Sequence, residues 1–129
     1  MFVKNRMKTK LITIDVDDSI LDARVLMEEK SIRRLPVMDG DQLVGVVSRQ
    51  DIANASPSLA TTFSVREINY LLDRMKVQEI MVKNPVTISP DALLEEAATL
   101  MREERFSFLP VVDDGELVGV ITESNIFEA

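Results

Sequence analysis

Hydrophobic and polar positions follow the same order twice along the chain, and the first round occupies its N-terminal part. A β-branched run at residues 12–14 precedes a segment in which Ile20, Ala23 and Met27 recur three or four positions apart. This spacing places apolar side chains on one face, so it predicts an amphipathic helix. Asp17 lies between the run and this segment, and we expect it to cap the helix.

Two apolar stretches follow the predicted helix. Residues 35–38 and 43–47 each predict a buried strand. Asp39-Gly40 lies between them and is a dipeptide typical of hairpin turns. A short helix is expected to begin at Ser48. The first round therefore has the order strand, helix, strand, strand, helix.

The second round is a copy of the first. The string LVGV at residues 43–46 recurs at 117–120, an offset of 117 − 43 = 74, which aligns residues 3–55 with 77–129. Identical residues occupy 19 of the 53 aligned positions, whereas ordinary composition gives about three or four by chance. Two copies are too few for a solenoid, so we expect a pseudo-twofold pair with one shared core. The matching predictions are a helix with Leu94, Ala97 and Met101 on one face, a capping Asp91, strands at 109–112 and 117–121, a turn at Asp114-Gly115 and a short helix from Thr122.

Residues 56–76 have no counterpart in the other copy. Pro57 and its Ser-containing neighbours interrupt the pattern. Ser64 and Glu67 then form the spacing of a capping box, which predicts the start of a helix. The apolar face of this helix would consist of Ile68, Leu71, Leu72 and Met75. We therefore expect a first repeat at 1–55, a connecting helix within 56–76 that packs on the repeats or on a second subunit, and a second repeat at 77–129.

Composition removes several function classes. The 129 residues include no Cys and no His, which excludes disulfides, a thiol nucleophile, a Ser-His-Asp triad and any metal site built on those side chains. The four Gly residues form neither a Walker loop nor a dinucleotide-binding fingerprint. We therefore expect no enzyme and no metal site.

Charge and hydropathy bear on the partners. The net charge is −7, and the first ten residues carry four basic side chains and no acidic one, so the remainder carries −7 − 4 = −11. Such an acidic body is a poor partner for nucleic acid or an anionic membrane, and we expect neither. No stretch reaches the roughly 18 apolar residues of a membrane span, and we expect no signal peptide and a cytoplasmic location.

Both copies resemble the CBS motif, named for cystathionine β-synthase. The matching parts are Val77-x-x-Ile80-Met81, Pro85-Val86-Thr87-Ile88-x-Pro90-Asp91, Ile32-Arg33-Arg34-Leu35-Pro36-Val37 and Gly45-Val46-Val47-Ser48-x-x-Asp51. The resemblance implies an α+β fold of two tandem β-α-β-β-α repeats, often called a Bateman module. It also implies a sensor that binds AMP, ADP, ATP or S-adenosylmethionine in clefts between the repeats, with no cofactor required, and a homodimer.

The resemblance assigns roles in a first cleft. Ser48 and Asp51 would hold the ribose, since a carboxylate accepts strong hydrogen bonds from two hydroxyls, although the same spacing also forms a capping box. Arg33 and Arg34 would meet phosphates, or they form surface ion pairs with the acidic body. Val46 would flank the base, and Ile80, Phe106 and Ser107 would form the far wall, with a core role as the alternative for Phe106.

A second cleft departs from this pattern. Asn125 occupies the position of Asp51, and Ser107 and Phe108 occupy those of the two Arg residues. Because an amide carries no charge, we expect this cleft to be weaker, empty or different in preference. Asn125 could equally be a polar residue at a helix end. The remaining residues that the resemblance places here are Arg6, Ile32, Val120 and Thr122.

The sequence thus supports a regulatory module that binds an adenosine compound and signals to an effector protein. The alternative is a scaffold without ligand that serves dimerisation and docking.

Overall fold

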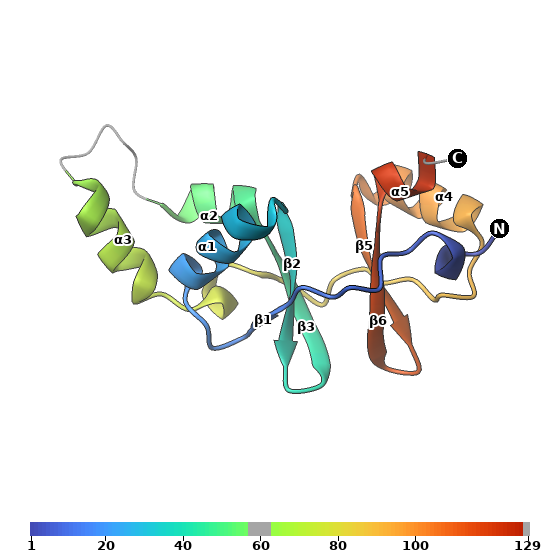
Figure 1. Cartoon of the computed structure of the whole chain (residues 1–129), viewed down its shortest axis with the longest axis horizontal. Helices are drawn as coiled ribbons and strands as arrows, with labels where there is room; N and C mark the ends of the chain where they lie inside the picture. The colour runs from blue at the N-terminus through green and yellow to red at the C-terminus, as the bar shows by residue number, and fades with distance from the viewer. Residues whose placement is uncertain (57–62, 128–129) are drawn as a thin grey trace. The chain divides into compact units, whose positions relative to one another are not determined.

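The computed structural model describes residues 1–56 and 63–127. The chain divides into two compact units, which are described separately below. We call residues 12–84 the first-repeat unit, and residues 1–11 together with 85–129 the second-repeat unit. Figure 1 shows that each unit combines helices with β-strands, so the fold is mixed α+β.

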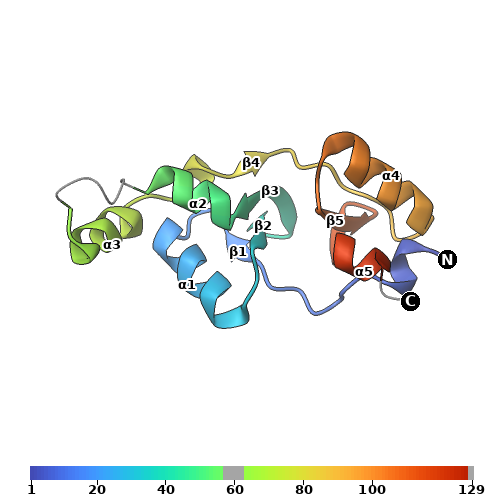
Figure 2. The same cartoon turned by 90° about the horizontal axis from the view of Figure 1, so that it is seen from above.

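The first-repeat unit is built on a four-stranded sheet. Its elements are β1 (Ile14–Asp15), α1 (Ile20–Lys30), β2 (Arg34–Asp39), β3 (Gln42–Ser48), α2 (Arg49–Ala55), α3 (Val65–Asp73), the 3-10 helix η2 (Val77–Glu79) and β4 (Val82–Lys83). The strand order is β1-β2-β3-β4, with β1 parallel to β2 and the other neighbours antiparallel. Figures 1 and 2 both place α1 and α2 on the same side of β2 and β3. The predicted order of strand, helix, strand, strand, helix is confirmed for this repeat.

The core of this unit contains the predicted apolar positions. Ile20, Ala23 and Met27 of α1 are buried, together with Leu35 of β2 and Val47 of β3. The spacing in the sequence identified this helix face because residues three or four apart lie on the same side of a helix and are buried together.

The expected cap of α1 was wrong. Ser19, not Asp17, is the N-cap: its side chain accepts from the backbone of Asp22, and the Asp22 side chain accepts from the backbone of Ser19. The same error applies to α4, whose N-cap position is Leu93 rather than Asp91 and carries no side-chain cap. In both helices the N-cap position lies two residues after the Asp and the helix begins one residue later, because the Asp itself lies in a turn.

The connecting helix α3 packs on the first repeat. Its predicted capping box is present, with Ser64 Oγ accepting from Glu67 N at 3.2 Å. Ile68 and Leu72 are buried in the same core as α1. Arg24 of α1 also donates from Nη2 to Asn69 Oδ1 of α3 at 2.6 Å.

The second-repeat unit has the same order of elements around its hairpin, but isolated bridges replace the outer strand pairs. Its elements are the 3-10 helix η1 (Val3–Asn5), α4 (Leu94–Glu104), β5 (Phe108–Asp113), β6 (Glu116–Thr122) and α5 (Glu123–Phe127). β5 and β6 are antiparallel, Ile88 makes an isolated parallel bridge with Val111, and Lys8 makes an antiparallel one with Val120. The buried cluster consists of Val3, Ala97, Met101, Leu109, Val111 and Ile121.

The two hairpins turn at aligned positions, residues 40–41 and 114–115. In the second hairpin Asp113 pairs with Glu116, so Asp114-Gly115 forms the turn as predicted. In the first hairpin Asp39 pairs with Gln42, which leaves Gly40 and Asp41 in the turn. The expected Asp39-Gly40 turn is therefore shifted by one residue, because Gly40, with φ of 60°, takes the first turn position.

Each unit includes a short segment that belongs by sequence to the other repeat, and we call these two the exchanged segments. They are residues 77–84 in the first-repeat unit and residues 1–11 in the second-repeat unit. Val77 N donates to Asp18 O at 2.8 Å, and Val3, which aligns with Val77, donates to Ala92 O at 2.8 Å. The alignment offset relates these two bonds, since 3 + 74 = 77 and 18 + 74 = 92. A repeat of the sequence is therefore not the same set of residues as a compact unit.

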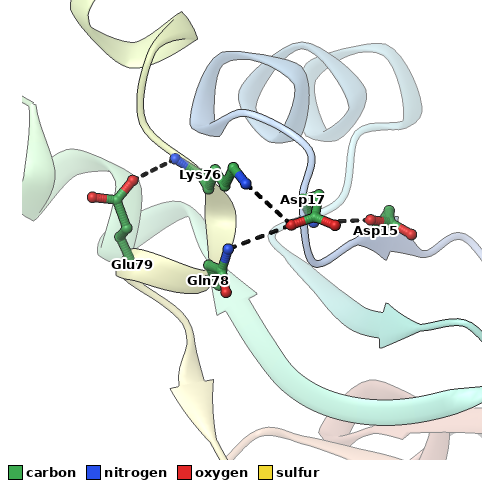
Figure 3. Close-up of polar contacts among 5 residues, drawn as sticks. All are labelled: Asp15, Asp17, Lys76, Gln78 and Glu79. Atoms are coloured by element: carbon green, nitrogen blue, oxygen red, sulfur yellow. Dashed lines mark hydrogen bonds and ion pairs between the residues drawn. The ribbon is translucent and has the colours of Figure 1, made fainter.

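Polar contacts hold the exchanged segment of the first-repeat unit (Figure 3). Asp17 Oδ1 accepts from Lys76 Nζ at 3.3 Å and from Gln78 Nε2 at 3.4 Å. Asp15 Oδ1 accepts from Asp17 N at 2.8 Å, and Glu79 Oε2 accepts from Lys76 N at 2.6 Å. Asp17 therefore anchors this segment instead of capping α1.

Within residues 1–56 and 63–127, no helix combines the length and the apolar character needed to cross a lipid bilayer.

Candidate functional site

Ser48 and Asp51 form a reciprocal cap at the start of α2. Asp51 Oδ2 accepts from Ser48 N at 2.8 Å, and Ser48 Oγ accepts from Asp51 N at 3.0 Å. The capping interpretation of this spacing is therefore confirmed. No hydrogen bond within the described residues uses Asp51 Oδ1 or the Ser48 hydroxyl proton. The cap thus leaves one carboxylate oxygen and one hydroxyl donor for other partners.

The two Arg residues lie beside this cap along the backbone. Arg34 is opposite Ser48 in the β2–β3 register, and Arg49 N donates to Arg33 O at 2.8 Å. Arg33 is exposed and Arg34 half-buried. Among residues 1–56 and 63–127, no acidic side chain forms an ion pair with either guanidinium. Two Arg residues therefore occupy backbone positions beside the cap, and neither forms an ion pair with Asp51 or another described acidic residue.

Val46 and Ile80 belong to the same unit as the cap. Val46 of β3 pairs with Val82 of β4, and Ile80 is half-buried just after η2. The first-repeat unit therefore contains six of the eight residues predicted for the first cleft, which we call the first half-site: Arg33, Arg34, Val46, Ser48, Asp51 and Ile80.

The other two predicted residues belong to the second-repeat unit. Phe106 is 42% exposed, which does not fit the alternative of a core position. Ser107 is half-buried, and its carbonyl accepts from Glu123 N at 2.9 Å. Their part in ligand binding stays a prediction.

The residues predicted for the second cleft include a cap of the same type. Thr122 N and Thr122 Oγ1 both donate to Asn125 Oδ1, each at 2.9 Å, and Asn125 N donates to Thr122 Oγ1 at 3.3 Å. Asn125 is only 3% exposed. We call Arg6, Val120, Thr122 and Asn125 of this unit the second half-site. Ile32 belongs to the first-repeat unit, where its N donates to Met27 O at 3.0 Å.

Arg6 comes from the N-terminal segment, residues 1–11, which pairs with Val120 of β6. Val120 and Lys8 exchange backbone hydrogen bonds of 2.8 and 3.0 Å. Arg6 is half-buried and donates from Nε to Met1 Sδ at 3.1 Å. The basic character of this half-site therefore depends on residues 1–8.

Sequence reasoning missed the residues that hold the exchanged segments. Asp17 accepts from Lys76, and Asp91, its aligned partner, accepts from Lys4 Nζ at 3.1 Å. The available signal was their identity in both copies, which pattern reasoning attributed to helix capping. No group of three or more acidic side chains in the described part of the chain is placed to hold a metal ion.

The chain was compared with known protein families. The family model described as "CBS domain" matches residues 3–58 and again residues 77–129. A CBS domain-containing protein of Dictyostelium discoideum is 35% identical over 130 residues, which cover 99% of this chain and 90% of that protein. Inosine-5′-monophosphate dehydrogenase of Korarchaeum cryptofilum is 37% identical over 118 residues, which cover 91% of this chain and 22% of that enzyme. The chain thus spans about a fifth of this enzyme relative and nearly all of the other protein.

Solved structures of CBS-domain pairs share the fold. CBSX2 of Arabidopsis thaliana, solved in complex with AMP, has a TM-score of 0.78 and 32% identity, covering 97% of this chain and 92% of that chain. The CBS domain pair of protein MJ0100, solved with 5′-methylthioadenosine and S-adenosyl-L-methionine, has a TM-score of 0.79 and 28% identity, covering 98% of this chain and 92% of that chain.

Proposed function

The chain belongs to the CBS domain family, and we propose that it is a regulatory module that binds an adenosine-containing nucleotide and signals to a partner protein. The two matched regions leave outside them only residues 1–2 and the segment 59–76. The two repeats therefore account for most of the residues of this chain.

One observation carries the proposal: in the first half-site, Asp51 with one carboxylate oxygen not used in the cap and two Arg residues without an ion pair belong to neighbouring backbone segments. Asp51 uses Oδ2 in its cap, while Oδ1 is available to accept from ribose hydroxyls. Arg33 and Arg34 supply planar donors of the kind that suit phosphate oxygens. A ribose with a phosphate attached is the chemistry that matches both groups at once.

The solved relatives support the same ligand class. CBSX2 holds AMP, and the MJ0100 pair holds 5′-methylthioadenosine and S-adenosyl-L-methionine. All three molecules carry an adenosine group. Because two Arg residues favour an anion, we propose AMP, ADP or ATP ahead of S-adenosylmethionine for this chain.

Regulation would follow from linkage. A ligand can shift the conformation of the module only as far as it binds one state better than another, and a partner that prefers the same state reads the shift. We propose that the effector is a separate protein and that the module is a homodimer. Sedimentation at micromolar concentration tests the dimer, and a monomer would contradict it.

The test of the binding function is thermal unfolding and calorimetry with AMP, ADP, ATP and S-adenosylmethionine. A ligand at a hundred times its dissociation constant should raise the free energy of unfolding by about 2.7 kcal/mol. Asp51→Asn keeps the cap acceptor but removes the charge, and it should weaken AMP binding at least about tenfold. The double variant Arg33→Ala and Arg34→Ala should weaken the binding of AMP more than the binding of adenosine, which has no phosphate.

Asp22→Asn is the matched control. Asp22 occupies the same capping position in α1, with its Oδ2 accepting from Ser19 N at 3.3 Å. This variant loses the same charge outside the half-site, so AMP affinity should not change. If none of the four compounds alters the unfolding temperature, the scaffold without ligand is the better function.

A further inference from the structure

The two caps differ in how many of their polar atoms are already engaged. Asn125 Oδ1 accepts two hydrogen bonds, one from Thr122 N and one from Thr122 Oγ1. An amide oxygen has two lone pairs, so both are taken. In the first cap Asp51 Oδ2 accepts one bond from Ser48 N, and Oδ1 has no partner among the described residues.

The hydroxyl groups of the two caps differ in the same way. Thr122 Oγ1 donates to Asn125 Oδ1 at 2.9 Å and accepts from Asn125 N at 3.3 Å. Ser48 Oγ accepts from Asp51 N at 3.0 Å, and its proton is not donated to any residue that the structure describes. The Thr122–Asn125 pair thus keeps no free lone pair on its amide oxygen and retains only the Nδ2 donors of Asn125, whereas the Ser48–Asp51 pair retains a hydroxyl donor and a carboxylate acceptor.

Burial separates the two side chains further. Asn125 is 3% exposed and is the one buried polar residue of the described chain, while Asp51 is half-buried. Truncating Asn125 would leave two half-buried Thr122 donors without their acceptor, which lowers stability. These contacts are those of a structural residue.

The surrounding charges point in the same direction. Ser107 and Phe108 align with Arg33 and Arg34, so the paired guanidinium groups of the first half-site have no equivalent here. Arg6 is one cation at this half-site, and its Nε donates to Met1 Sδ.

We infer that Asn125 is a structural residue whose occupied oxygen cannot accept hydrogen bonds from ribose hydroxyls, so that the chain binds one equivalent of adenosine nucleotide at the first half-site. This inference rests on the proposed function for its binding part. Its structural part, the role of Asn125 in holding α5, stands without a ligand.

Titration calorimetry with AMP tests the binding part. We expect one equivalent for the unaltered chain and at least about a tenfold loss of affinity in Asp51→Asn. Asn125→Ala should bind one equivalent with an affinity within about twofold of the unaltered chain. Two equivalents in the unaltered chain, or a binding event lost on Asn125→Ala, would overturn the inference.

Thermal unfolding without ligand tests the structural part. Asn125→Ala should lower the unfolding temperature by about 3–6 °C, and the exposed neighbour Ser124→Ala should not change it. If Asn125→Ala does not fold, Thr122→Val removes the hydroxyl partner alone and should cause a smaller decrease. An unchanged temperature in both variants contradicts a structural role. Failure of the unaltered chain to bind any adenosine compound would instead contradict the proposed function, and the thermal measurement would still decide the role of Asn125.

Discussion

The first-repeat unit and the second-repeat unit share an order of elements but not a core of the same size. Among the residues that the structure describes, eleven buried ones form one cluster in the first unit, which includes Ile68 and Leu72 of the unduplicated helix α3. In the second, the buried cluster has six members. Since stability scales with the apolar surface removed from water, the first-repeat unit should be the more stable of the two. The unit that carries the proposed binding half-site is thus the one with the additional helix.

The largest effect should come from removing the anchor of that helix. Leu72 is fully buried, so Leu72→Ala leaves a cavity and should lower the free energy of unfolding by about 2–5 kcal/mol. Tyr70→Ala is the control, because Tyr70 is on the same helix but is 59% exposed. Urea denaturation measures both variants. Equal small effects would show that α3 does not add to the core.

A second prediction concerns the close approach of each exchanged segment to a glycine. A Cβ on Gly45 would lie 2.9 Å from Val82 O, and a Cβ on Gly119 would lie 2.9 Å from Lys8 O. Because these backbone oxygens are held in the strand pairing, Gly45→Ala and Gly119→Ala should each lower the free energy of unfolding by about 1–3 kcal/mol. Denaturation of the two variants should give similar losses.

Gly40→Asn is the control for these two variants. Gly40 has φ of +60° and no neighbouring atom within 4 Å of the added Cβ. Asn tolerates this backbone region, so the loss of stability should be small. A large loss in this control and none at Gly45 would contradict the role given to the exchanged segments.

Much of the fold could be predicted because the responsible signals are local. The spacing of Ile20, Ala23 and Met27 identified the buried face of α1, and the Ser64–Glu67 and Ser48–Asp51 spacings identified two capping boxes that the structure contains. The contacts involved span a few residues, so the order of residues along the chain is sufficient to specify them.

The rest depended on contacts between distant residues. Asp17 and Asp91 fit a helix cap by position, but their partners Lys76 and Lys4 lie 59 and 87 residues away. A segment such as residues 1–8 could pack on equivalent surfaces of either repeat. No local sequence pattern indicates which repeat it contacts. Similarly, the spacing of Thr122 and Asn125 did not reveal that the amide oxygen would be fully engaged.

A third prediction uses the caps of α1 and α4, which occupy aligned positions. Ser19 caps α1 with Asp22, whereas the aligned Leu93 provides no side-chain cap to α4. Ser19→Ala should therefore cost about 1 kcal/mol. Leu93→Ser places a hydroxyl three residues before Glu96 and should gain about 0.5–1 kcal/mol by completing a capping box.

Thermal unfolding of the two cap variants would measure these opposite signs. Asp91→Ser is the control: Asp91 precedes the N-cap, and the change also removes the exposed ion pair with Lys4, so it should give no gain. If Leu93→Ser destabilises the chain, the side chain of Leu93 contributes more through packing than a cap would provide.

The smallest effect should come from the residue that follows the last turn of each of these helices. Ser31 and Arg105 are the C-caps of α1 and α4, and both adopt the left-handed conformation, with φ of 54° and 57°. Glycine adopts this region without a steric penalty, so Arg105→Gly should raise the free energy of unfolding by about 0.5–1 kcal/mol, and Ser31→Gly should have a similar effect. Arg102→Gly is the matched control, because Arg102 lies within α4 and glycine there should cost about 1 kcal/mol. Chemical denaturation of the three variants would measure these opposite changes in the free energy of unfolding. A loss of stability in Arg105→Gly would mean that the Arg side chain stabilises the second-repeat unit by more than the left-handed backbone conformation destabilises it.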